Sequence, residues 1–173
     1  MAKKGEISHF ETQKKNKPTP QSLFDQFSDK ETREVGVKFL EYLSELRTNP
    51  SWYATNSYSV NYKGKRVCLL RIDPNYRGGD DRFLIHLYAP DRQKTETYLA
   101  NLSVVELQPY LSGLKRCVHC AGCAPGVTVT LGSVQMDEMC RYFGFSYHNP
   151  TTIQLEAVKK LIEIRREDIG SNA

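Results

Sequence analysis

Three stretches of alternating apolar and polar residues follow one another between residues 56 and 90, and they constrain the fold more than any other feature of the chain. The alternating apolar positions of the first two stretches are Tyr58, Val60, Tyr62, Val67 and Leu69. Lys63-Gly64 separates these two stretches, and RFLIHLYAP forms the third. A period of two is typical of strands with one buried face, and strands joined by short turns pair antiparallel. The pattern therefore predicts an antiparallel sheet of three or four strands.

Helical periodicity appears on both sides of these strands. Apolar residues recur every three or four positions over residues 30–47, and we expect Leu43 on the buried side of this helix. A second helix is predicted over residues 95–108, because Pro109 interrupts the pattern there. Runs of strands and helices in separate parts of a chain predict an α+β fold, with helices covering one face of the sheet.

The C-terminal third contains three further predicted elements. Residues 126–133 are β-like, and residues 134–145, VQMDEMCRYFGF, are expected to form a short helix. Residues 151–168 have the strongest helical pattern of the chain, with Asn149 as the N-cap. The buried stripe of this last helix is expected to include Ile153, Ala157, Val158, Leu161 and Ile162.

The length of 173 residues predicts one domain with a tail. We expect residues 1–20 to form a basic, disordered tail and residues 21–173 to form the α+β domain, including a cysteine-rich segment at 117–140. The net charge is only +4, and no aromatic residues for base stacking accompany the lysines of the tail, so nucleic-acid binding is not expected. No apolar run is long enough for a bilayer, and no signal peptide is recognisable, which predicts a cytoplasmic protein with reduced thiols.

The stretch CVHCAGCAPG, residues 117–126, contains three of the five cysteines at a strict spacing of three. Its glycines and proline favour a loop, and a loop lets thiolates converge that a helix would spread along its axis. Structural zinc sites use four thiolate or imidazole ligands in a tetrahedral arrangement. The predicted zinc ligands are Cys117, Cys120, Cys123 and Cys140, with His119 or His148 as a substitute.

Other readings of the same cysteines stay open. The spacing also begins the bacterial ferredoxin pattern, which makes an iron–sulfur cluster the second candidate, although the expected fourth cysteine is replaced by Val127. Two overlapping Cys-x-x-Cys pairs could form a redox dithiol, with Lys115, Arg116 and His119 lowering a thiol pKa. The thiols could also be free. Cys68 lies within a predicted strand, where a buried and inert thiol is expected.

Two other groups of residues are candidates for ligand binding. Aromatic residues near the first strands could line a small-molecule pocket or simply pack the sheet against helices: Trp52, Tyr53, Tyr58, Tyr62 and Tyr76. His86 could point into such a pocket, although a hydrogen-bonded core or surface histidine is the commoner arrangement. RGGDD, residues 77–81, has the composition of a hairpin loop rather than of a calcium or phosphate site.

These features together predict a non-enzymatic, cytosolic binding or regulatory module with a structural zinc site and a small-molecule ligand near the sheet aromatics. The alternative is a thiol-redox or metal-dependent enzyme that uses the same four cysteines. The two classes differ in coordination, because a structural site is closed by four protein ligands and a catalytic site keeps one position open. Nothing in the sequence indicates an oligomeric state.

The last third of the chain, residues 117–169, resembles a group of small bacterial proteins of clostridial type. These proteins combine a cysteine-rich loop, a later cysteine and a helix with the pattern NP…LE…KKLI, which this chain carries at residues 149–162. The hairpin-and-strand region is similar in layout to the α+β modules of the YdhG and YjbR type. The resemblance implies one α+β unit in a bacterial protein and the four cysteines as the shared positions, and it implies no particular activity.

Overall fold

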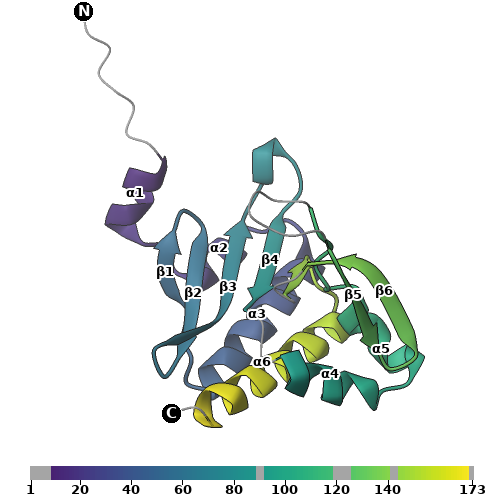
Figure 1. Ribbon diagram of the computed structural model, residues 1–173. Helices are drawn as coiled ribbons and strands as arrows, with labels where there is room; N and C mark the ends of the chain where they lie inside the picture. The colour runs from purple at the N-terminus through teal and green to yellow at the C-terminus, as the bar shows by residue number, and fades with distance from the viewer. Residues whose placement is uncertain (1–8, 89–91, 119–125, 141–143, 172–173) are drawn as a thin grey trace, which may run out of the picture.

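A five-stranded antiparallel sheet and a separate two-stranded sheet form the β-structure of the chain (Figure 1). The computed structural model describes residues 9–88, 92–118, 126–140 and 144–171. The larger sheet has the order β1-β2-β3-β4-β7, and β5 pairs with β6. The strand bounds are β1 Ser51–Ala54, β2 Ser57–Tyr62, β3 Lys65–Asp73, β4 Arg82–Leu87, β5 Val127–Leu131, β6 Val134–Met139 and β7 Phe145–His148. With the helices described below, the predicted α+β class is confirmed. The sheet has five strands instead of the predicted three or four, because β1 and β7, which lie outside residues 56–90, also join it.

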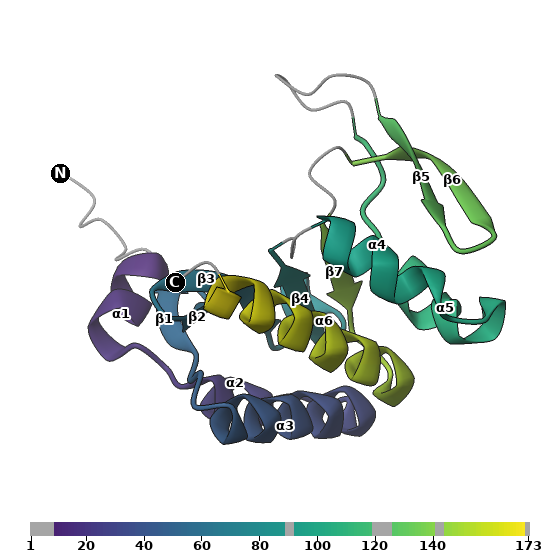
Figure 2. The same ribbon diagram turned by 60° about the horizontal axis from the view of Figure 1, so that its bottom comes forward.

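The helices α2, α3 and α6 cover one face of the larger sheet (Figure 2). Phe24 of α2 and Phe39 of α3 pack on Phe83 of β4, with ring centres 4.9 Å and 6.3 Å from that of Phe83. The helix bounds are α1 His9–Asn16, α2 Pro20–Phe24, α3 Lys30–Glu45, α4 Arg92–Ala100, α5 Val104–Leu111 and α6 Thr152–Ser171. None of the helices in the described part of the chain combines the length and apolarity that a bilayer crossing needs.

The pairing of β2 with β3 contains a bulge, which corrects the predicted faces of β3. Val60 pairs with Cys68, so Val67 is an additional residue in the ladder. Because side chains alternate along a strand, the insertion moves the following residues to the other face. The buried residues beyond the bulge are Cys68, Leu70 and Ile72. Leu69, predicted to lie on the buried face together with Val67, instead lies partly exposed on the face away from the helices.

Two predicted helical segments have a different structure. Residues 134–139, expected to begin a short helix, form strand β6, because they pair with β5 across a tight turn in which Gly132 has a φ of 58°. The helix predicted over residues 95–108 is two helices, α4 and α5. Ser103 separates them, since its hydroxyl accepts from the Glu106 amide while the Glu106 carboxylate accepts from the Ser103 amide, which starts a new helix.

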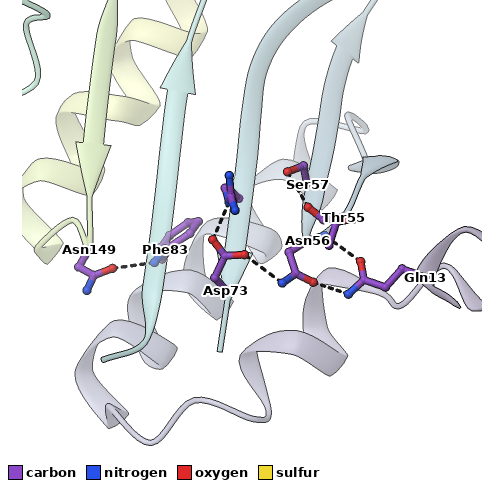
Figure 3. Close-up of polar contacts among 8 residues, drawn as sticks. Gln13, Thr55, Asn56, Ser57, Asp73, Phe83 and Asn149 are labelled. Carbon is purple, nitrogen blue, oxygen red and sulfur yellow. Dashed lines mark hydrogen bonds and ion pairs between the residues drawn. The ribbon is translucent and has the colours of Figure 1, made fainter. Parts of the chain in front are cut away.

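Part of the basic tail expected over residues 1–20 is helical and attached to the sheet. The side chain of Gln13 on α1 accepts a hydrogen bond from the Asn56 amide at 2.8 Å and donates one to the Asn56 side chain (Figure 3). Asn56 in turn donates to the buried carboxylate of Asp73 at 2.9 Å. The tail thus contains a helix whose polar contact reaches the end of β3, and residues 1–8 lie outside the described residues.

Asn149 has a different role from the predicted N-cap of the last helix. Its side chain accepts a hydrogen bond from the Phe83 amide at 2.6 Å and donates to the Asp81 carbonyl at 2.9 Å, so it joins β7 to the start of β4 (Figure 3). Helix α6 starts instead with a reciprocal pair, because Gln154 donates to the Thr151 hydroxyl and accepts from the Thr151 amide.

Candidate functional site

A hollow of about 520 Å³ lies on the face of the larger sheet that is turned away from α2, α3 and α6, and we call it the sheet-face pocket. Strand alternation supplies its floor. Phe83 and Ile85 of β4 are fully buried in the core, so Leu84 and His86 lie on the opposite face. Leu69 of β3 pairs with His86 and completes an apolar and aromatic floor.

Strand β7 forms one side of the sheet-face pocket. Ser146 pairs with His86 and His148 pairs with Leu84, so both polar side chains border the floor. The Ser146 hydroxyl and Nδ1 of His86 are 2.7 Å apart, which fixes the orientation of this imidazole. His86 is therefore both a hydrogen-bonded histidine and a residue that lines a pocket, the two arrangements that the sequence left open.

The electrostatic surroundings of the two histidines are positive. Burial lowers the pKa of His86, and the nearby ammonium of Lys115 lowers it further. Burial likewise lowers the pKa of His148, with an additional contribution from the guanidinium of Arg82. Each imidazole is therefore mostly neutral at pH 7, and each lies close to one cationic side chain.

Three cationic side chains border the sheet-face pocket: Arg71, Arg82 and Lys115. Arg71 is neutralised by Asp73, whose carboxylate lies 2.6 Å from its Nε. Arg82 stacks on the ring of Tyr76 at 4.8 Å, and no carboxylate in the described part of the chain pairs with Arg82 or Lys115. The pocket thus has an excess of positive charge.

The five aromatic residues proposed to line one pocket are in fact divided among different surroundings. Tyr53 lines the sheet-face pocket, and its ring is held by Arg66 at 4.7 Å. Tyr58 is buried on the helix-covered face and donates a hydrogen bond to the Pro18 carbonyl. Trp52 and Tyr62 pack against the core, and Tyr76 lies in the loop between β3 and β4. The ligand predicted near the sheet aromatics would therefore meet Tyr53.

Cys117 and Cys140 lie on two paired segments of the chain. Arg116 and Met139 form an antiparallel bridge, with hydrogen bonds from Cys117 N to Glu138 O at 2.7 Å and from Cys140 N to Lys115 O at 2.8 Å. The two cysteines are each one residue beyond this bridge, which makes them diagonal neighbours on the face opposite the buried Met139. Diagonal neighbours have Cα atoms about 7–8 Å apart and Cβ atoms somewhat closer.

Gly126, where the described chain resumes after the cysteine-rich stretch, lies against Cys117. A Cβ atom at Gly126 would be 3.0 Å from the Cβ of Cys117 and 2.7 Å from the Cα of Glu138. Cys117 and Gly126, which flank residues 118–125, therefore lie against each other, next to the strand that leads to Cys140.

Gly126→Ala is expected to destabilise the protein by about 1–3 kcal/mol, because the added methyl group would meet backbone atoms that cannot move independently. Gly170→Ala is the matched control: it lies in α6 with nothing within 4 Å of an added Cβ, and it is expected to stabilise by up to about 1 kcal/mol. Urea denaturation followed by circular dichroism measures both. Equal effects of the two substitutions would contradict the close approach at Gly126.

The other residues considered for the metal site have different positions. Cys120, Cys123 and His119 lie outside the described residues, and within those residues no group of three metal-ligating side chains occurs. His148 lines the sheet-face pocket rather than the cysteine pair. Cys68 is completely buried, and burial raises the pKa of its thiol, as expected of an inert core cysteine.

No protein-family model, curated protein or solved structure matches this chain. The resemblance to clostridial proteins and to YdhG and YjbR modules stays a prediction.

Several residues of the sheet-face pocket were not identified from the sequence. For β4 the signal was present, because Arg82, Leu84 and His86 alternate with the apolar core positions of RFLIHL. Ser146 and His148 gave no comparable signal, since β7 has only four residues. Lys115 precedes the cysteine stretch and joins the pocket only through tertiary pairing.

Proposed function

We propose that this protein is a non-enzymatic, cytosolic binding module in which Cys117, Cys120, Cys123 and Cys140 hold one structural zinc ion. The observation that carries the proposal is the bridge between Arg116 and Met139, which brings the first and last of these cysteines to the same face of a strand pair although 22 residues lie between them in the sequence.

The chemistry of zinc agrees with this spacing. Two thiolates bound at about 2.3 Å to a tetrahedral ion have their sulfurs roughly 4 Å apart, which diagonal neighbours on paired strands can reach. The contact of Gly126 with Cys117 returns the chain to the same place after Cys120 and Cys123. Four thiolates leave no position for water or substrate, and such a site stabilises structure rather than performing catalysis.

The free energy that zinc binding is expected to contribute is large for a segment of this size. Structural zinc binding contributes on the order of 10 kcal/mol at neutral pH, enough to offset the entropy lost when a glycine-containing loop is ordered. The role proposed for the ion is therefore to hold residues 115–140 in position beside the larger sheet, where Lys115 lines the sheet-face pocket.

Metal analysis of the purified full-length protein tests the proposal. We expect about one equivalent of zinc per chain in a colourless protein. Cys140→Ser is expected to remove the zinc, whereas Cys68→Ala is expected to retain it because Cys68 is buried in the core. Amide resonances of residues 115–117 and 138–140 should shift in Cys140→Ser while those of β2 and β3 remain.

Three results would contradict the proposal. A brown protein with visible absorption would indicate an iron–sulfur cluster instead. Metal-free protein whose thiols react freely, with a melting temperature that a strong chelator leaves unchanged, would indicate free thiols or a redox dithiol. Retention of the zinc in both Cys117→Ser and Cys140→Ser would place the ion elsewhere.

A further inference from the structure

The sheet-face pocket combines an uncovered apolar floor with unpaired cations. Leu69 and Leu84 on this floor are only partly buried, although both belong to central strands of the sheet. No carboxylate is among the described residues that line it. Cations on the helices have acidic neighbours, as in the pairs Lys159–Glu156 at 2.8 Å and Lys160–Glu163 at 3.1 Å. Arg82 faces Asp73 across the ladder, but that carboxylate bonds to Arg71. Neither Arg82 nor Lys115 therefore has a carboxylate partner among the described residues, which leaves this face complementary to an anion.

The two unpaired cations lie at opposite ends of the floor. Arg82 starts β4 and is close enough to His148 to lower its pKa, whereas Lys115 acts in the same way on His86. Residues 82 and 86 are four positions apart on one strand, which corresponds to about 13 Å. Long side chains at both ends can bend towards the floor between them.

We propose that the sheet-face pocket binds a small organic dianion with an apolar middle, whose anionic groups lie at Arg82 and Lys115 and whose body lies on Leu69 and Leu84. The volume of about 520 Å³ suits a small molecule. The neutral imidazole of His148 lies at the rim and supplies a further hydrogen-bond donor, whereas the Ser57 hydroxyl already donates to the Thr55 carbonyl. Carboxylate and phosphate groups share the required chemistry.

This inference deepens the binding function proposed above, but it does not require the zinc ion. Lys115 pairs with Cys140, so loss of the metal could move it, whereas Arg82 lies on a central strand. A substitution of Arg82 is therefore the better test, because the position of Arg82 does not depend on the cysteine segment. A failure of the zinc proposal appears in the metal analysis, and a failure of this one appears in ligand titrations of the protein as purified.

Titration with a matched series of probes tests the proposal: biphenyl-4,4′-dicarboxylate, biphenyl-4-carboxylate, the neutral 4-phenylbenzyl alcohol and inorganic phosphate. Calorimetry should show the dicarboxylate binding about tenfold more tightly than the monocarboxylate, with a weaker affinity at high salt. Amide shifts should map to β3, β4 and β7. A phosphonate in place of one carboxylate should bind comparably if any anionic group is accepted, and much more tightly if phosphate esters are the natural ligands.

Arg82→Gln and Lys115→Gln should each weaken the dicarboxylate about tenfold and leave the neutral alcohol unchanged. Lys38→Gln is the control, since Lys38 is an exposed cation on α3, on the other side of the sheet. Equal affinity for the neutral and dianionic probes, an unchanged affinity in Arg82→Gln, or amide shifts confined to α4 and α5 would overturn the proposal. Tighter binding of single-stranded oligothymidylate than of any probe, lost in Arg82→Gln, would replace the small molecule by a nucleic acid.

Discussion

Replacing Leu161 by alanine is expected to lower the free energy of unfolding by about 2–5 kcal/mol, because the side chain is 1% exposed and its removal leaves a cavity. Leu161 lies on the side of α6 that packs on β3 and β4. Leu43→Ala on α3 should have a similar effect, since Leu43 is completely buried. Urea denaturation followed by circular dichroism gives the change in each case.

Ile153→Ala is the matched control on the same helix. Ile153 was expected in the buried stripe of α6, but its side chain is 69% exposed. Its replacement should therefore change the free energy of unfolding by less than about 0.5 kcal/mol. A loss at Ile153 as large as that at Leu161 would mean that another molecule or segment covers the start of α6, and a negligible loss at Leu161 would contradict the packing of this helix.

The position of Ile153 illustrates how far periodicity predicts a helix. The pattern of residues 151–168 correctly places Ala157, Val158, Leu161 and Ile162 in the core. The first turn is different, because Thr151 and Gln154 start the helix and Asn149 is bonded to β4. A helical period identifies a stripe, but which end of the stripe is covered depends on neighbouring elements that the local sequence does not show.

The strands also differ in how far the sequence predicts which of their side chains are buried. The alternation in β4 predicts its core side chains directly, since each residue pairs regularly with β3. In β3 the bulge at Val67 reverses the faces, and one additional residue in a ladder leaves no mark in an apolar stretch such as VCLL. Strands β1 and β7 have four residues each, too few for a period to be recognised. β1 pairs with the neighbouring β2, whereas β7 pairs with β4, more than 50 residues earlier in the chain.

The two candidate sites differ in the same way. The cysteine spacing is a local signal, so the candidate metal ligands could be predicted without a structure. The pairing of residues 115–117 with 138–140 adds how the chain brings Cys140 back beside Cys117. The sheet-face pocket has no local signature, because its residues come from five separated segments and its charge depends on which carboxylates are paired elsewhere. It could only be recognised once the register of β3, β4 and β7 was known.

Asp81 offers a prediction that connects folding with pH. Its buried carboxylate accepts hydrogen bonds from the backbone amides of Ser28, Asp29 and Asn75 and from the Ser28 hydroxyl, which ties the start of α3 to the loop between β3 and β4. Asp81→Ala leaves these donors without an acceptor. We expect a loss of about 3–4 kcal/mol in the free energy of unfolding at pH 7, since hydrogen bonds to a charged group are worth more than neutral ones.

The pH dependence distinguishes the charge of Asp81 from its packing. Burial opposes ionisation of this carboxyl, but the hydrogen bonds from Asn75, Asp29 and Ser28 outweigh it and hold its pKa below the ordinary value of an aspartate. A lowered folded-state pKa contributes stability that is present above the unfolded pKa and is lost as the pH falls through the folded one. The difference in free energy of unfolding between the native protein and Asp81→Ala should therefore be constant above about pH 5 and shrink below the unfolded pKa of about 3.9.

Asp80→Ala removes the adjacent, exposed carboxylate and should change the free energy of unfolding by less than about 0.5 kcal/mol at every pH. A deficit in Asp81→Ala that stays the same down to pH 2 would show that the side chain stabilises the fold by packing alone.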